Sequence, residues 1–142
     1  MRASIDAVGL PERFDRHVAA ALPACVTDRQ MAQIVVANLV ENALKYGPPD
    51  GRVRADLAVS ARDGRRGVAL RVANAVGPAG RPDAAHVFDK YHRGPRHQSG
   101  SGLGLYLSHR LTTRLCGVLA LCEPEGDAVA FELWLPCRGE IF

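Results

Sequence analysis

Residues 38–46, with the sequence NLVENALKY, form the second half of a predicted helix that carries a strip of polar side chains. Over residues 31–44 this helix is apolar nearly all round, so most of it is expected to be buried. At about 100° per residue, Asn38, Asn42 and Lys45 lie within about 60° of one another and face the same direction. Asparagine oxygens suit magnesium, and Lys45 can neutralise a phosphate oxygen. The strip therefore predicts a polar site on a buried helix, although two buried amides and an exposed lysine would give the same pattern.

The borders of this helix are marked by residues that start and stop helices. Residues 27–30 (TDRQ) match a capping box, so we expect the helix to begin near Thr27. We expect it to end at Tyr46, with Gly47 as a left-handed terminator, because the prolines that follow forbid continuation. Upstream, residues 13–24 are predicted to form an edge strand or a loop that enters the core.

The rest of the chain predicts strands, a second helix and one long irregular segment. Strands are expected at residues 53–60, 67–74, 118–122 and 128–136, and the second helix at residues 102–116. Ser101 is the expected N-cap of that helix and Gly117 its stop. Residues 62–66 would connect the first two strands, and residues 75–101 have the composition of a functional lid. Because strands and helices do not alternate regularly, we predict an α+β two-layer sandwich, with a mixed β-sheet and helices on one face.

The composition is that of a single globular domain, residues 1–142. Hydrophobic residues make up 47% of the chain, and the formal net charge is +3. This charge is too small to indicate nucleic acid as a partner, and no apolar run approaches the roughly 18 residues of a membrane span. The four cysteines form no C-x-x-C pair, which favours reduced thiols. We therefore expect a cytoplasmic location, with no direct membrane contact by this domain.

Two glycine-containing segments follow the polar strip. Residues 100–105 (GSGLGL) open the second predicted helix, where free backbone amides favour an anion and glycines let a phosphate approach closely. Asn74, Gly77 and Gly80 come at the end of a predicted strand, where the backbone can pass close to a flat ring. The structural alternatives are a tight turn in the first segment and an ordinary loop in the second.

Together, three motifs resemble those of bacterial sensor histidine kinases. Residues 38–46 are similar to the N box, residues 87–93 (VFDKYHR) to the F box, and residues 100–105 to the G2 box. Their order and spacing resemble the catalytic ATP-binding domain of the gyrase, Hsp90, histidine kinase and MutL superfamily, over about residues 14–136. The resemblance implies a Bergerat-type ATP-binding fold, with ATP and Mg²⁺ as cofactors.

The resemblance also implies roles for individual residues. Asn42 would hold the magnesium ion. Asn38, Lys45 and Arg93 would serve the phosphates as the catalytic residues, and Tyr46 would line the nucleotide pocket. The other residues implied in nucleotide binding lie in or beside the glycine segments: Asn74, Gly77, Gly80, Ser101, Gly102, Leu103, Gly104 and Leu105.

Two departures from the family pattern bear on function. The family's G1 box is D-x-G-x-G, whose Asp accepts a hydrogen bond from adenine, whereas this chain has Asn74 there and a path to Gly80 that is two residues longer. An asparagine can turn its nitrogen outward and donate, so we expect a weaker preference for adenine over guanine. The family's phosphoacceptor motif, a histidine followed by an acidic residue, does not occur. The expected partner is therefore a histidine-containing dimerisation domain, which belongs to the same kinase or to a partner kinase. That kinase can be anchored in the inner membrane. A response regulator is expected as an indirect partner.

Asn38 also discriminates between acceptors. In ATP-hydrolysing members of the superfamily and in its anti-sigma serine kinases, a glutamate four residues before the magnesium-binding asparagine acts as a general base. In this chain Asn38 occupies that position. A neutral imidazole already has a lone pair and needs no such base, so the sequence favours transfer of the γ-phosphoryl group of ATP to a histidine. The alternatives are an anti-sigma-factor-type serine protein kinase and a degenerate, non-catalytic nucleotide-binding module.

Overall fold

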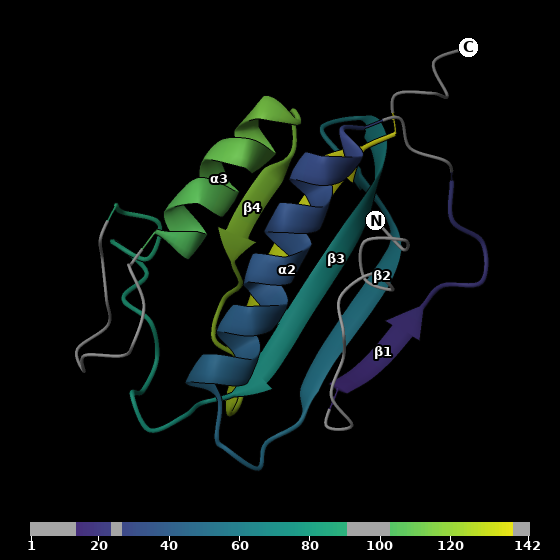
Figure 1. Cartoon of the computed structure of the whole chain (residues 1–142). Helices are drawn as coiled ribbons and strands as arrows, with labels where there is room; N and C mark the ends of the chain where they lie inside the picture. Colours follow the sequence, from purple (N-terminus) through teal and green to yellow (C-terminus); the bar gives the residue numbers. More distant parts are fainter. Residues whose placement is uncertain (1–13, 24–26, 91–102, 138–142) are drawn as a thin grey trace.

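The computed structural model describes residues 14–23, 27–90 and 103–137, which form a five-stranded sheet and two helices. The strands are β1 (Phe14–Val18), β2 (Val53–Arg62), β3 (Arg65–Ala75), β4 (Val118–Leu121) and β5 (Ala128–Pro136), in the spatial order β1-β2-β3-β5-β4. The helices α2 (Arg29–Tyr46) and α3 (Gly104–Arg114) lie on one face of the sheet and run antiparallel to each other (Figure 1). Only β1 and β2 pair in parallel, so the described sheet is mixed. The predicted α+β two-layer sandwich is confirmed.

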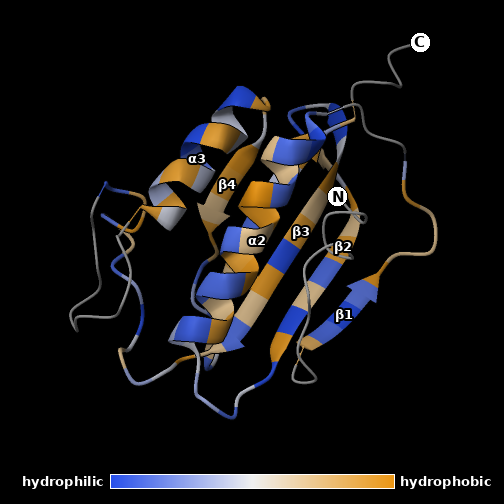
Figure 2. Ribbon diagram, in the orientation of Figure 1, coloured by the Kyte–Doolittle hydropathy of each residue, from blue (hydrophilic) through white to orange (hydrophobic). Residues whose placement is uncertain are grey.

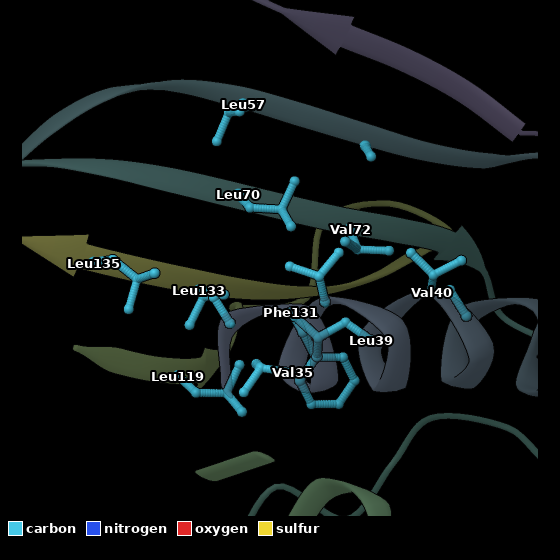
Figure 3. Close-up of a cluster of buried hydrophobic side chains, with 14 of the residues drawn as sticks. Val35, Leu39, Val40, Leu57, Leu70, Val72, Leu119, Phe131, Leu133 and Leu135 are labelled. Atoms are coloured by element: carbon cyan, nitrogen blue, oxygen red, sulfur yellow. The ribbon is translucent and has the colours of Figure 1, made fainter. Parts of the chain in front are cut away.

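The core lies between the sheet and α2. Leu70 of β3 and Leu133 of β5 are 0% exposed, and they point toward Val35 and Leu39 of the helix (Figure 3). Burial of each such side chain contributes about 1.5–3 kcal/mol, so α2 is fixed firmly on the sheet. The polar strip on the same helix is therefore held in a defined position.

The strand β1 is the edge strand that the sequence suggested. Its middle residues are hydrophilic, whereas β2 and β3 show bands of hydrophobic residues (Figure 2). The carboxylate of Asp15 accepts a hydrogen bond from Nε of Arg52 at 2.8 Å, and this bond holds the pKa of Asp15 below its usual value. The ion pair ties β1 to the residue that precedes β2.

The two ends of α2 differ in detail from the sequence prediction. The N-cap is Asp28 rather than Thr27, because the carboxylate of Asp28 accepts a hydrogen bond from the backbone N–H of Met31 at 3.1 Å. Gly47 ends the helix as predicted, but its φ of −78° and ψ of 174° are extended and not left-handed. Gly47 precedes Pro48, and a residue before proline is driven toward the extended region.

The connection between β2 and β3 is tighter than predicted. The two strands pair as far as Arg62 and Arg65, so the expected connection over residues 62–66 reduces to Asp63 and Gly64. Both of these residues have positive φ, 52° and 75° respectively. Asp-Gly is a favoured two-residue hairpin turn because it tolerates this geometry.

The helix α3 is also shorter than the predicted helix at residues 102–116. It begins at Gly104, and the predicted cap, Ser101, lies outside the described residues. At the other end the left-handed residue is Cys116, with a φ of 61°, and not Gly117. Gly117 is needed for another reason, since a Cβ there would lie 2.3 Å from the carbonyl oxygen of Trp134.

Candidate nucleotide-binding site

The fold brings three of the predicted site segments together. The C-terminal end of α2 and the end of β3 lie together at the lower end of the view in Figure 1. The loop that follows β3 runs from there toward the start of α3 (Figure 1). The end of the segment that resembles the N box and the loop after β3, where the family carries its G1 box, are thus neighbours in space although they are distant in the chain.

The polar strip on α2 is partly exposed. Asn42 makes no hydrogen bond to any residue that the structure describes, so its amide oxygen is available. The ammonium of Lys45 lies 5.4 Å from the ring centroid of Tyr46, and it forms no ion pair within residues 14–23, 27–90 and 103–137. Glu41, beside Asn42 in the chain, is exposed to solvent. The strip therefore offers an amide oxygen and a positive charge on the same side of the helix.

Asn38 is engaged with α3. Its Nδ2 donates a hydrogen bond to Oγ of Ser108 at 2.9 Å and a longer one to the carbonyl oxygen of Gly104 at 3.4 Å. Ser108 is fully buried, and the sequence analysis missed it. A serine on the inner face of an otherwise amphipathic helix was the available signal. The predicted role of Asn38 toward the phosphates stays a prediction.

The loop after β3 passes so close to the end of α2 that it requires a glycine. A Cβ at Gly77 would lie 2.0 Å from the carbonyl oxygen of Tyr46 and 2.9 Å from the carbonyl carbon of Gly47. Gly80 follows with a φ of +80°, in the left-handed region that favours glycine. Two of the predicted glycines therefore have distinct backbone reasons for their identity.

Asn74 is buried at the end of β3, with 7% of its surface exposed. Its Nδ2 donates to the carbonyl oxygen of Ala75 at 2.8 Å, and its side chain lies against Gly47. The nitrogen is therefore engaged inside the protein, contrary to the expectation that it turns outward. Its Oδ1 accepts no hydrogen bond from the described residues, and this atom is the acceptor that the side chain retains.

The rest of the loop is anchored on two sides. The Arg81 guanidinium donates to the carbonyl oxygen of Gly126, between β4 and β5, and to that of Ala128, the first residue of β5, at 2.8 Å for the latter. Phe88 stacks on His109 of α3, with ring centroids 4.9 Å apart. The segment that resembles the F box is thereby attached to the helix that the glycine segment opens.

An exposed ion pair lies between these anchors. Nδ1 of His86 is 2.7 Å from Oδ2 of Asp89, and this hydrogen bond, with the charge of Asp83, raises the pKa of the imidazole. Exposed pairs of this kind contribute little to stability. His86 is therefore a surface residue of the loop.

Several predicted site residues fall at or beyond the limits of the described chain. Arg93, Ser101 and Gly102 lie outside the described residues. Leu103 directly precedes α3, and the partly buried side chain of Leu105 packs against the core. A Cβ at Gly104 would meet no described atom within 4 Å, so close packing does not require this glycine.

Comparison with known proteins now defines the class. A family described as "Histidine kinase-, DNA gyrase B-, and HSP90-like ATPase" matches residues 27–139, which include both helices and all strands except β1. The two-layer sandwich with its polar strip is therefore an ATP-binding domain. The chain belongs to the histidine kinase-, DNA gyrase B- and HSP90-like ATPase family.

Within this family the similar proteins are sensor histidine kinases. Sensor histidine kinase GlrK of Escherichia coli (strain K12) is 30% identical over 117 residues, which cover 80% of this chain and 24% of GlrK. The structure of the mycobacterial sensor histidine kinase MprB has a TM-score of 0.68 at 24% identity, and the match covers 89% of this chain and 85% of that chain. Full-length ShkA in complex with AMPPNP has a TM-score of 0.66 at 25% identity, and the match covers 87% of this chain and 25% of that chain.

The similar region is one part of each curated relative. The chain spans about a quarter of the length of the curated relatives it matches. Its match and its fold are those of the ATP-binding catalytic domain of a histidine kinase.

Proposed function

We propose that this chain binds ATP with Mg²⁺ and transfers the γ-phosphoryl group to a histidine on a separate dimerisation domain. One observation carries the proposal: Asn42, without a partner among the described residues, lies along α2 between Asn38 and Tyr46. Asn38 contacts the start of α3, and the Tyr46 backbone contacts Gly77. A ligand on this side of α2 would therefore contact the polar strip, the start of α3 and the loop at Gly77 at the same time.

Phosphoryl transfer requires mainly positioning and charge neutralisation. Lys45 and Arg93 would supply positive charge to the phosphates. The backbone of residues 101–105 would supply amides at the start of α3, where the helix dipole favours an anion. Tyr46, Asn74, Gly77 and Gly80 would surround the base, because they lie at the opposite end of the strip.

The side chains present fit a magnesium ion. Magnesium prefers oxygen ligands and takes only one or two from the protein when phosphates and water supply the others. Asn42 offers a carboxamide oxygen that no described residue occupies. When bound, the ion would neutralise charge on the phosphate oxygens.

The partners follow from the kinase relatives. We propose that a histidine-containing dimerisation domain, of the same or a partner kinase, accepts the phosphoryl group, and that a response regulator receives it indirectly. The proteins that carry the similar region are named as sensor histidine kinases. Within the described ranges, neither helix has the length and apolar character needed to cross a bilayer. We also propose that residues 1–142 form one cytoplasmic domain that binds no nucleic acid.

A labelling experiment tests the proposed transfer. The chain incubated with Mg²⁺ and γ-labelled ATP is expected to remain unlabelled, and a supplied histidine-containing dimerisation domain to acquire acid-labile phosphate. Stoichiometric label on this chain alone would contradict the proposal. Acid-stable label on a serine would support the anti-sigma type of kinase. Nucleotide binding without any transfer would support a non-catalytic module, which the Asn74 substitution in the G1 position favours.

Base selection gives a second prediction. Because Nδ2 of Asn74 is engaged by Ala75, the remaining Oδ1 can accept from the amino group of adenine but cannot donate to the carbonyl of guanine. The chain is therefore expected to prefer ATP over GTP. Asn74→Ala should weaken ATP binding about three- to tenfold and GTP binding less, since a neutral hydrogen bond contributes roughly 0.5–1.5 kcal/mol. Calorimetric titrations with both nucleotides measure this difference, and an equal loss for ATP and GTP would show that Asn74 does not read the base.

A further inference from the structure

A buried hydroxyl pair distinguishes the inner face of α3. Ser108 and Thr112 are 0% and 1% exposed. An apolar side chain at either position would need no hydrogen-bond partner, whereas a hydroxyl does. A buried hydroxyl costs free energy unless it is hydrogen-bonded. Thr112 meets this requirement within its own helix, because its Oγ1 donates to the carbonyl oxygen of Ser108 at 2.7 Å. Ser108 instead accepts its hydrogen bond from another helix, at 2.9 Å from Nδ2 of Asn38.

The residue that precedes α3 does not cap this helix with its side chain. The N-cap residue is Leu103, which makes no side-chain capping hydrogen bond, and the first turn contains no acidic residue. The amide of Asn38 reaches this region from α2, since its Nδ2 lies 3.4 Å from the carbonyl oxygen of Gly104 as well as 2.9 Å from Ser108. One side chain of α2 thus contacts two successive turns at the beginning of α3.

We propose that Ser108 is a positioning residue that, through Asn38, fixes the first turn of α3 relative to Asn42. This inference rests on the proposed function, in which the start of α3 serves the phosphates and Asn42 the magnesium ion. Asn38 is one helical turn before Asn42 on the same strip. The Asn38–Ser108 hydrogen bond therefore sets the distance between the two groups that would contact the triphosphate.

A purely structural role for Ser108 predicts something different. Removal of the Ser108 hydroxyl leaves Nδ2 of Asn38 without this acceptor and therefore destabilises the fold, and a general loosening of the fold would weaken the binding of every nucleotide equally. A positioning role predicts a loss of nucleotide affinity that is larger for nucleotides with more phosphates. The number of phosphates on the nucleotide therefore separates the two roles.

The test compares Ser108→Ala with Thr113→Ala. Thr113 is a matched control because it is exposed on the same helix, and its hydroxyl donates to the His109 carbonyl oxygen of that helix at 3.1 Å. Dissociation constants for AMP, ADP and ATP, each with Mg²⁺, are measured by competition against a fluorescent ATP analogue. We expect Ser108→Ala to weaken ATP and ADP about three- to tenfold and AMP less than about twofold, with no change in Thr113→Ala.

The partner residue completes the test. If Ser108 acts through Asn38, then adding Ser108→Ala to an Asn38→Ala variant should cause no further loss of ATP affinity. Additive losses would overturn the proposed connection. Equal weakening of AMP and ATP by Ser108→Ala, or no weakening of either, would overturn the positioning role.

A measurement without nucleotide keeps this inference separate from the proposed function. Hydrogen exchange at the amides of residues 107–109 should be faster in Ser108→Ala than in the wild-type chain, and unchanged in Thr113→Ala. If the wild-type chain bound no nucleotide, the proposed function would fail, whereas exchange would still report on the contact. Unchanged exchange in Ser108→Ala would overturn the inference whatever the nucleotide results.

Discussion

Replacement of Asn42 by alanine is expected to abolish phosphoryl transfer to a supplied histidine domain while the fold stays intact. The side chain is only partly buried and has no hydrogen bond to the described residues, so its loss leaves none of these residues with an unsatisfied partner. Loss of a group that stabilises charge at the phosphates typically slows such a reaction on the order of a hundredfold or more. The transfer rate with Mg-ATP and the thermal melting curve measure the two parts of this expectation.

Glu41→Gln is the matched control for Asn42→Ala. Glu41 is the neighbouring residue of α2, is exposed, and lies about 100° further round the helix, so its neutralisation should leave transfer unchanged. A near wild-type rate in Asn42→Ala would disprove the assignment of the metal ligand. A large loss in Glu41→Gln would instead make Glu41 a base and would favour a serine acceptor.

The features that could be predicted from the sequence are those that local geometry decides. The polar strip of Asn38, Asn42 and Lys45 follows from the helical period alone. Residues 13–24 were predicted only as an edge strand or a loop, and the structure shows the edge strand β1 there. Two local details were also present in the sequence but were misinterpreted. Pro48 forces Gly47 into an extended conformation, and Asp63-Gly64 is itself a hairpin signal.

The features that could not be predicted depend on contacts between distant segments. Asn38 and Ser108 are 70 positions apart, and no periodicity in either helix indicates that they meet. The nitrogen of Asn74 could turn either way until the Ala75 carbonyl was seen to accept from it. The requirement for Gly77 likewise comes from the Tyr46 backbone, which β2 and β3 separate from it in the chain. Sequence motifs identified Asn38, Asn74 and Gly77 but not Ser108, whereas the contacts of all four depend on the fold.

Gly77→Ala is expected to destabilise the chain and to abolish nucleotide binding. The added Cβ would lie 2.0 Å from the Tyr46 carbonyl oxygen and 2.9 Å from the Gly47 carbonyl carbon, which are backbone atoms that cannot rotate away. The loop or the end of α2 must therefore move, at a cost of roughly 3 kcal/mol or more. For a domain of this size we expect the melting temperature to fall by about 10 °C. Because Tyr46 is displaced, ATP should not bind even at temperatures where the variant is folded.

Gly80→Ala separates this clash from a general effect of losing a glycine in the same loop. A Cβ at Gly80 would meet no described atom within 4 Å, and only its φ of +80° is unfavourable for alanine. The cost of that conformation is about 1–2 kcal/mol, so Gly80→Ala should be the more stable of the two variants. Equal melting temperatures for Gly77→Ala and Gly80→Ala would contradict the contact between Gly77 and the end of α2. A stable Gly77→Ala variant that binds ATP normally would remove the loop after β3 from the site altogether, because the close approach to Tyr46 is what brings this loop to the polar strip.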